Sequence, residues 1–322
     1  MNKPPNTGNT PSDNNQDRIL LGIFLAIAMV FCTSVMDGIA KWLTASYSIV
    51  SIILIRNTFS LPIAFILMIK TGGLKNMKSD RPWLLAARSS LIIFAAGSFY
   101  AALPFMPLAE AFAIAFVAPL FTTVLSIIFL NEKVGPHRWA VLGTGFIGVL
   151  IVLQPGTDSF QPAAIFPVAA AFFYAVLMIM TRQLRHHSTS SGMTLWGTIA
   201  TVCLASISLV LPWEPFAWTL PSGNDLLLLV GMAGVATTAH FLTGQAYRYA
   251  PAAVIAPFDY TMLLWGMIFG WVFWQEIPEI HVLAGAAVII SSGLYLIYRE
   301  SQAKNKTVQD NPLLKSNTPP TA

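Results

Sequence analysis

About ten long apolar runs, separated by short polar segments, dominate this sequence and decide what it can fold into. A helix that crosses the hydrocarbon core of a bilayer needs roughly 20 mostly apolar residues. Charged residues make up only 10% of the chain, whereas a soluble domain carries about 25%. The sequence therefore predicts an all-α membrane protein with about ten transmembrane helices. The predicted helices span residues 19–41, 46–69, 83–104, 107–130, 137–153, 162–181, 192–211, 225–247, 252–274 and 281–298.

The two ends of the chain depart from this pattern. Residues 1–18 and 301–322 are rich in Asn, Pro and other polar residues. They cannot bury an apolar core, so both are predicted to be disordered tails. The two cysteines, Cys32 and Cys203, lie in apolar runs without metal-ligand spacing, which indicates small buried side chains. No metal or other cofactor is expected.

Lysine and arginine are distributed very unevenly between the predicted loops. If both tails face the cytoplasm, nearly all of these residues fall on the cytoplasmic side. Only Lys41 falls outside, while Arg56 and Arg88 lie within helices. This asymmetry matches the positive-inside rule and predicts a multi-pass protein of the bacterial inner membrane with both termini cytoplasmic. It also explains the basic pI of about 9.1 without a nucleic-acid partner.

The chain contains an internal repeat. At an offset of 144 residues, Pro, Glu, His and aromatic positions coincide, and near the start of each half two basic residues coincide at an offset of 141. The matched pairs include Pro107 and Pro251, Phe116 and Tyr260, Glu132 and Glu276, His137 and His281, and Lys41 and Arg182. Each unit holds about five helices, an odd number, so the second unit enters the membrane from the opposite side. Inverted repeats are typical of transporters; the alternative is a chance likeness between apolar helices.

Several motifs carry a family resemblance. They are Phe-Leu-Asn-Glu-Lys-Val (129–134), Trp-Ala-Val-Leu-Gly (139–143) and Phe-Trp-Gln-Glu-Ile-Pro (273–278). With them the chain resembles the EamA-type members of the drug/metabolite transporter superfamily. The resemblance implies two inverted five-helix repeats, residues 19–153 and 162–298, around a central cavity with alternating access. One departure is Leu263, where the family has a proline matching Pro119; Pro257 lies six residues earlier.

The substrate is less constrained than the family. The segment Ala-Pro-Phe-Asp-Tyr-Thr-Met-Leu-Leu-Trp (256–265) resembles bacterial riboflavin-type members, so riboflavin or a similar planar aromatic metabolite is the expected cargo. Export of amino acids or other metabolites is the alternative. A membrane-embedded enzyme or a non-transporting sensor would be another class. We find no nucleophile with a base and no H-E-x-x-H motif, so the chain is not expected to be an enzyme.

Charged residues within apolar helices usually face a cavity or a partner. Asp37 and Lys41 are four residues apart and share a helix face, which fits a gate, a substrate contact or a local ion pair. Arg56 lies near mid-depth of its helix and needs an anionic or carbonyl partner. It is a candidate for substrate binding, or for holding Asp37 or a broken backbone. Arg88, nearer the helix end, is predicted to snorkel to the headgroups.

Two further groups could titrate during a transport cycle. Asp259 follows Pro257 and adjoins Tyr260, and His240 lies on the preceding helix with Gln245 five residues later. Asp259 or His240 is a candidate carrier for a coupled proton, with structural hydrogen bonding as the rival. Glu132 and Glu276 each close a helix before a short turn and fit a structural role or a gate, and Glu110 is placed to complement a helix N-terminus.

Aromatic residues are candidates for the cavity wall. Tyr100, Phe116, Tyr174, Tyr260 and Trp265 lie in helices that line the cavity in the resembled family, and aromatic walls suit planar ligands; core packing is the alternative for each. The run Gly143–Gly148 spells G-x-G-x-x-G, but it lies inside a predicted helix without a preceding strand, so it indicates close helix packing. The expected partners are a small-molecule substrate, a coupled proton and the lipid bilayer, and the sequence is also compatible with a homodimer.

Overall fold

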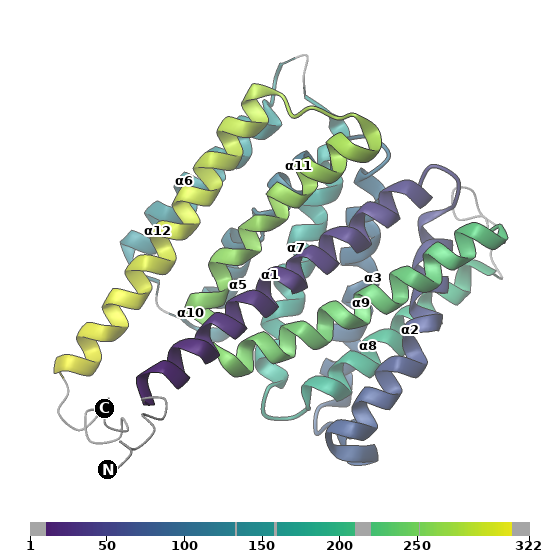
Figure 1. Cartoon of the computed structure of the whole chain (residues 1–322), viewed down its shortest axis with the longest axis horizontal. Helices are drawn as coiled ribbons and strands as arrows, with labels where there is room; N and C mark the ends of the chain where they lie inside the picture. The colour runs from purple at the N-terminus through teal and green to yellow at the C-terminus, as the bar shows by residue number, and fades with distance from the viewer. Residues whose placement is uncertain (1–10, 133, 158–159, 210–219, 251, 311–322) are drawn as a thin grey trace, which may run out of the picture.

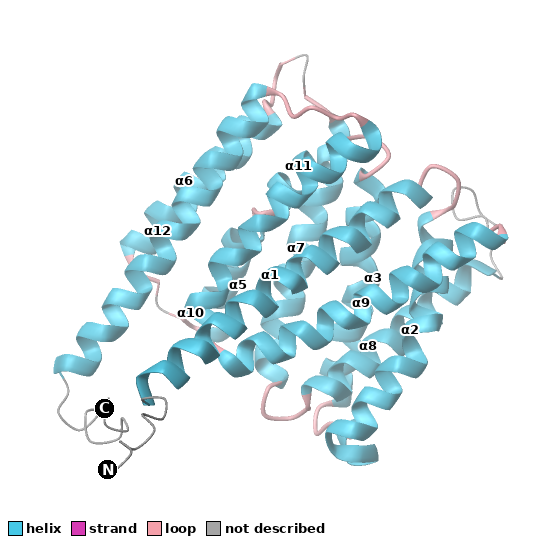
Figure 2. Cartoon of the chain, in the orientation of Figure 1, coloured by secondary structure: helices cyan, strands magenta, loops and turns pink. Residues whose placement is uncertain are grey.

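The computed structural model describes residues 11–132, 134–157, 160–209, 220–250 and 252–310, and within these ranges every regular element is a helix (Figure 2). The α-helices are α1 Pro11–Leu43, α2 Ile49–Gly72, α3 Pro82–Ala102, α4 Leu108–Ala115, α5 Ala118–Leu130, α6 Pro136–Leu153, α7 Ile165–Leu184, α8 Ser190–Ser206, α9 Gly223–Tyr249, α10 Ala252–Ile255, α11 Thr261–Trp274 and α12 Ile280–Asp310. Short 3₁₀ helices occupy Gly73–Met77 (η1), Pro162–Ala164 (η2), Ile207–Leu209 (η3) and Ala256–Tyr260 (η4). The prediction of an all-α protein is confirmed.

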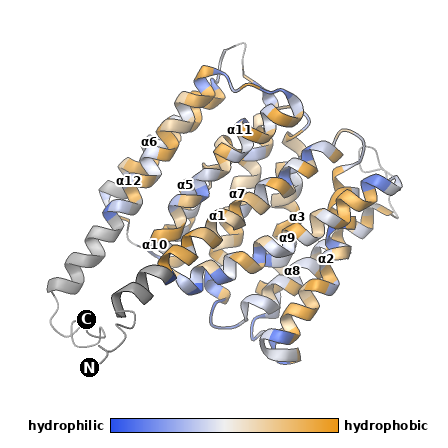
Figure 3. Cartoon of the chain, viewed as in Figure 1, coloured by the Kyte–Doolittle hydropathy of each residue, from blue (hydrophilic) through white to orange (hydrophobic). Residues whose placement is uncertain are grey.

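Six of the helical segments in the described ranges are long and apolar enough to cross a membrane. They are Arg18–Leu43, Ile49–Met77, Pro82–Ala102, Leu108–Leu130, Pro162–Leu184 and Gly223–Tyr249. Shorter apolar segments cover Trp139–Leu153 and Ile280–Leu296, and Figure 3 shows apolar residues along most of the helices. The chain is therefore a multi-pass membrane protein, and the full number of ten spans stays a prediction.

Two of the predicted helices are broken at related places. The run 107–130 forms α4 and α5, which are separated at Phe116 and Val117. The run 252–274 forms α10, η4 and α11, with Pro257 inside the 3₁₀ segment. Proline removes a backbone donor and disfavours a continuous helix, so Pro257 marks the break although Leu263 replaces the proline that matches Pro119. Phe116 and Tyr260, which the repeat pairs, both lie at these breaks.

The two broken helices also end alike. Asn131 after α5 and Gln275 after α11 both adopt the left-handed conformation, with φ values of 52° and 57°. The next residue then donates its backbone N–H to a carbonyl six positions earlier: Glu132 to Ser126 at 3.3 Å and Glu276 to Gly270 at 3.0 Å. The prediction that Glu132 and Glu276 follow helix ends is confirmed, and the local geometry of the two ends is the same.

Helix contacts follow the same relation between the two halves (Figure 1). The helices α2 and α8 pack together, as do α6 and α12, and each of these two pairs joins counterparts. The helix α4 also packs against α11, the counterpart of α5. The contact between α1 and α9 has its counterpart in the contact between α7 and α3. In addition, α1 begins and α12 ends at the same end of the bundle (Figure 1).

Glycine lets α6 and α12 approach closely. A Cβ atom at Gly148 would collide with the Gly285 carbonyl oxygen, and a Cβ at Gly145 would crowd the hydroxyl of Ser292. Gly143 has open space around it. The close packing predicted for this glycine motif is thus present at Gly145 and Gly148, where small residues allow two backbones to touch.

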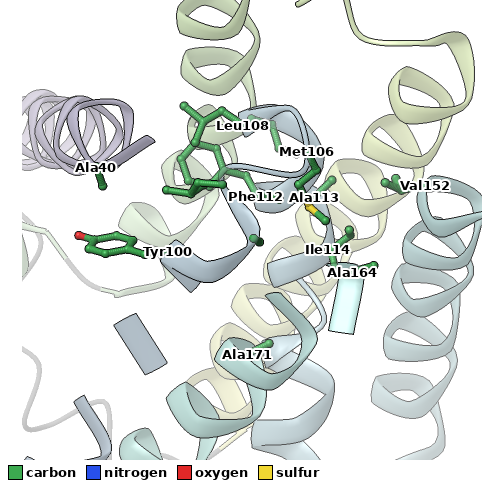
Figure 4. Packing of buried hydrophobic residues seen from close by; sticks show 14 of the residues in the cluster. Ala40, Tyr100, Met106, Leu108, Phe112, Ala113, Ile114, Val152, Ala164 and Ala171 are labelled. Carbon is green, nitrogen blue, oxygen red and sulfur yellow. The ribbon is translucent and has the colours of Figure 1, made fainter. Parts of the chain in front are cut away.

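The buried core lies around α4. Phe112, Leu108 and Ile114 are at most 1% exposed, as is Tyr100 on α3. Figure 4 shows these side chains gathered about α4 with residues from neighbouring helices. Because α4 is short and enclosed, it places the break at Phe116 inside the bundle.

The terminal helices are longer than predicted. Residues 11–18 belong to α1 and residues 301–310 belong to α12, so these parts of the predicted tails are helical in the structure. An apolar helix that is already formed can extend into polar sequence, because each further residue adds one hydrogen bond without a new nucleation step. The outermost parts of both tails lie outside the described residues.

Candidate functional site

Arg56 is one of two buried charged side chains in the same region of the bundle. It lies on α2 and is 8% exposed. Its Nη1 donates a hydrogen bond to the Tyr100 hydroxyl at 2.9 Å and contacts the Met36 sulfur at 3.4 Å. Its Nε is buried and has no hydrogen-bond partner among the described residues. A buried charge that is only partly hydrogen-bonded is costly, so Arg56 retains capacity to bind an acceptor.

Asp37 brings the opposite charge to the same region. It lies on α1 and is 5% exposed, and the charge of Arg56 acts on its carboxylate. Within the described part of the chain, Asp37 makes no side-chain hydrogen bond and no ion pair within 4.0 Å. The structure therefore does not contain the local ion pair with Lys41 that was one interpretation of their shared face.

His240 and Arg88 face the same interior. His240 on α9 lies within electrostatic range of both Arg56 and Arg88. Its side chain is exposed in the structure. Arg88 donates to the Thr181 hydroxyl at 2.8 Å and to the Met193 carbonyl at 3.2 Å. The prediction that Arg88 snorkels is wrong, because its helix face turns it toward α7 and α8.

An aromatic cluster lies between α1 and α11. The ring of Trp265 meets Phe31 edge to face at 4.8 Å between centroids and stacks on Phe269 at 6.0 Å. The indole Nε1 of Trp265 is buried without a hydrogen-bond partner in the described ranges, whereas buried Trp N–H groups usually find one. Trp265 thus combines an aromatic face with an unused donor.

Asp259 lies in η4 among tyrosines. Its carboxylate is within electrostatic range of Tyr174, Tyr247 and Tyr260. Tyr174 is 50% exposed. Tyr260 stacks on Phe116, with centroids 5.0 Å apart and planes 22° apart. The two residues that the repeat pairs therefore touch each other at the two helix breaks.

The family comparison agrees with this arrangement. The EamA-like transporter family matches residues 20–154 and again residues 161–299. The chain belongs to this family. The two matches cover most of the sequence, one in each half. Family membership supports a membrane transporter of small metabolites.

Individual relatives carry more specific names. An S-adenosylmethionine uptake transporter of Rickettsia felis is 29% identical over 287 residues, 89% of this chain and 96% of that protein. A riboflavin transporter of Rhizobium johnstonii is 29% identical over 292 residues, 90% of this chain and 95% of the other. A riboflavin transporter of Vibrio cholerae is 33% identical over 202 residues, 62% of this chain and 66% of the other. A solved crystal structure at 19% identity shares the fold, with a TM-score of 0.59 over 88% of this chain and 99% of that one.

The basic and acidic residues at the helix ends of this EamA-like protein form two ion pairs. Lys41 pairs with Glu276, and Arg182 pairs with Glu132. We call the two ends of the bundle where they lie the Lys41 end and the Arg182 end. Glu110 is in the first turn of α4, as predicted, and is within electrostatic range of Lys41. Neither pair joins residues that are close in sequence.

Gln245 lies apart from the central groups. Its amide oxygen accepts a hydrogen bond from Arg248 at 3.4 Å near the end of α9. A pocket beside the Phe116–Tyr260 stack is walled by α5, α6 and α12 and lined mainly by apolar side chains such as Leu120, Val141 and Ile289. It contains none of the charged candidates.

The sequence interpretation missed three contributors to this EamA-like site. Phe31 completes the wall beside Trp265, Met36 contacts Arg56, and Arg88 faces the interior. Met36 adjoins Asp37 in sequence and Phe31 lies six residues before it, and neither spacing places two side chains on one helix face, so no local pattern marked these residues. No group of three or more potential metal ligands is present in the described ranges.

Proposed function

We propose that this EamA-like protein is a secondary transporter that carries a planar aromatic metabolite, riboflavin or a similar compound, through the bundle by alternating access. The observation that carries the proposal is a set of buried polar groups without a partner in the described ranges: the donors Arg56 Nε and Trp265 Nε1, and the Asp37 carboxylate, which makes no ion pair. In an apolar bundle such groups are costly unless something pairs with them. A substrate that offers matching groups supplies that pairing.

The aromatic wall favours a planar ring. Phe31, Trp265 and Phe269 present faces and edges at the spacings at which aromatic rings attract. The relatives named for riboflavin and for S-adenosylmethionine act on compounds that share a planar nitrogen heterocycle. A planar ring supplies the aromatic contacts that Trp265 offers, and acceptors on the ligand supply the partner that Arg56 Nε lacks.

A second candidate substrate is S-adenosylmethionine. It carries a carboxylate and cationic groups beside its planar ring, while riboflavin carries no net charge. Arg56 and Asp37 bring both signs of charge to one region, and opposite charges in a water-poor site discriminate strongly between ligands. This observation favours the zwitterionic compound over a neutral one.

The proposed cycle uses the relation between the two halves. Two similar units of inverted topology can rock about a midplane site and open it to each side in turn. The corresponding breaks in α4–α5 and α10–α11 supply the flexible points. The chain carries no ATP-binding motif, so a solute or proton gradient supplies the energy, with Asp259 as the proposed proton carrier.

Flux through sealed vesicles tests the proposal. Purified full-length protein in proteoliposomes should exchange internal for external labelled riboflavin or S-adenosylmethionine, and empty liposomes should not. A membrane enzyme would instead convert substrate in detergent as well as in vesicles. A sensor would bind ligand without moving it. Binding without counterflow for both compounds and for a panel of amino acids would defeat the transporter assignment.

A further inference from the structure

Two ion pairs, at opposite ends of the bundle, are counterparts under the internal repeat. Lys41 corresponds to Arg182, and Glu276 corresponds to Glu132. Each pair nevertheless joins one half to the other, because Lys41 and Glu132 belong to the first half while Glu276 and Arg182 belong to the second. The sequence repeat relates the residues singly, and only the folded chain reveals that they pair crosswise.

The pair at the Lys41 end is enclosed and highly connected. Lys41 is 7% exposed and Glu276 is 24% exposed. Besides Glu276, the Lys41 ammonium donates to the Met106 carbonyl at 3.0 Å and lies 5.1 Å from the centre of the Trp274 ring. The second oxygen of Glu276 accepts the Leu108 backbone N–H at 3.4 Å. This pair therefore binds α1, the α3–α4 turn and the α11–α12 turn together.

The pair at the Arg182 end is open by comparison. Arg182 and Glu132 are 46% and 41% exposed, and their contact is a single hydrogen bond of 3.4 Å. In the described ranges, neither side chain makes a further hydrogen bond. Exposed pairs of this kind add little to stability, whereas removing one partner of a buried pair is strongly destabilising.

The same chemistry thus occurs twice in related backbone settings but is buried at only one end. A rigid structural role would leave this difference unexplained, because both turns share the same left-handed cap and backbone hydrogen bond. A protein that exchanges the conformations of its two halves would have one enclosed pair and one exposed pair in each of its two end states.

We infer that the two ion pairs are alternating locks, with Lys41–Glu276 closing one end of the bundle in the state described and Arg182–Glu132 closing the other end in the opposite state. This inference rests on the alternating access proposed above. The structure is then the state closed at the Lys41 end. When α1 leaves the α11–α12 turn, α7 closes on Glu132, and the buried charge pairing lost at one end is regained at the other.

Distance measurements between spin labels test the locks without any substrate. One label pair, Ala45→Cys with Ile277→Cys, reports the Lys41 end, and another, Gly135→Cys with His186→Cys, reports the Arg182 end. All four positions are exposed. Cys32 and Cys203 are changed to Ala, and the full chain is measured in lipid nanodiscs by pulsed electron resonance.

Glu276→Gln should lengthen the distances at the Lys41 end and shorten those at the Arg182 end in the same sample. Glu132→Gln should act in the opposite direction, by removing the lock of the other state. We expect each change to shift the ratio of the two states on the order of tenfold, because a buried pair loses one charge. The charge exchange Lys41→Glu with Glu276→Lys should restore the parental distances only in part, because the new carboxylate faces the Met106 carbonyl and the new ammonium faces the Leu108 N–H.

The decisive measurement is the change in label distance at the end of the bundle opposite the substituted residue. If Glu276→Gln loosens only the Lys41 end, the pair is a local fastening and the inference is overturned. Glu132→Gln neutralises an exposed side chain, so it should fold even if Glu276→Gln does not; unchanged distances at both ends in this variant would also overturn the inference. Glu279→Gln is the matched control, because Glu279 is 74% exposed beside the same turn and its one ion pair among the described residues is with His281. These distances are measured without a transport assay, so their outcome is distinguishable from a failure of the proposed transport function.

Discussion

The two halves of the molecule share their backbone geometry but differ in the chemistry they bring to the centre. Each half has a helix that breaks midway and ends in a left-handed residue followed by a glutamate. The first half supplies the central charges Asp37 and Arg56. The second half supplies His240, Asp259 and the indole of Trp265.

In the first half, the positions that correspond to Asp259 and Trp265 hold apolar residues without a polar side-chain group. Asp259 corresponds to Ala115, and Trp265 corresponds to Phe121. By contrast, the residues at the helix ends keep their charge, with Lys41 matched by Arg182 and Glu276 by Glu132. Under the proposed alternating access, movement of the halves would constrain the breaks, caps and end pairs, while the binding of one asymmetric ligand would leave the centre free to specialise.

The predicted opposite orientation of the two halves in the membrane should give the largest experimental effect. With both termini in the cytoplasm, a cysteine at Ile277 should react completely with a membrane-impermeant maleimide added to intact cells, and one at Val134 should be spared. These positions follow the related turns at Glu276 and Glu132. Lysed cells should label at both positions. Labelling of both from outside would show that the halves are not inverted.

Removing the charge of Arg56, in the first half, should have the next largest effect. Arg56→Ala should lower counterflow at least about tenfold while leaving the amount of folded protein nearly unchanged, because a hydrogen bond to a charged group contributes about 1.5–3 kcal/mol. Arg56→Lys should rescue little, since an ammonium cannot reproduce the guanidinium fork. Arg81→Ala, at an exposed position, is the control. An equal loss of folded protein and flux would make Arg56 a structural residue.

The second half is tested through Asp259. Asp259→Asn keeps the shape of the side chain and removes its proton exchange. We expect substrate counterflow to persist at near the parental rate, while accumulation driven by a proton gradient falls to the equilibrium level. Both are measured side by side in liposomes. An Asn variant that still accumulates substrate like the parent would assign Asp259 a structural hydrogen bond.

The smallest effect should come from the stack that joins the two halves. Phe116→Leu and Tyr260→Leu each remove one ring of the 5.0 Å pair, and aromatic pairs contribute about 0.5–1.5 kcal/mol beyond their buried area. Each change should lower the thermal midpoint by a few degrees. The double variant should cost less than the sum of the two single changes. Strict additivity would mean that the rings contribute independently of each other.

Hydropathy predicted most of the helix positions, because a run of apolar residues is sufficient to define a membrane helix. It also placed the helix ends before Glu132 and Glu276, but it gave residues 252–274 as one continuous run, without the break at Pro257. The direction in which Arg88 points was not predictable in this way. Its distance from the helix end suggested snorkelling, but its orientation is set by packing against Thr181 and Met193.

The side chains that pair with the charged residues were even harder to predict from the sequence. Lys41 and Glu276 lie 235 positions apart, and no local pattern connects them. The repeat did identify Lys41 with Arg182 and Glu132 with Glu276, so the four residues were marked as related. Their crosswise pairing follows from the packing of α1 beside α11 and of α5 beside α7, which depends on the whole bundle.

The left-handed caps have a practical consequence for handling the protein in detergent. Outside glycine, a left-handed residue costs roughly 1–2 kcal/mol, and asparagine tolerates it better than glutamine. Gln154 and Gln275 both adopt this conformation, with φ values of 43° and 57°. Replacing either by glycine keeps the backbone hydrogen bond that ends the helix and removes the clash of the Cβ atom. These two positions are therefore places where a longer-lived purified sample can be engineered without touching the interior.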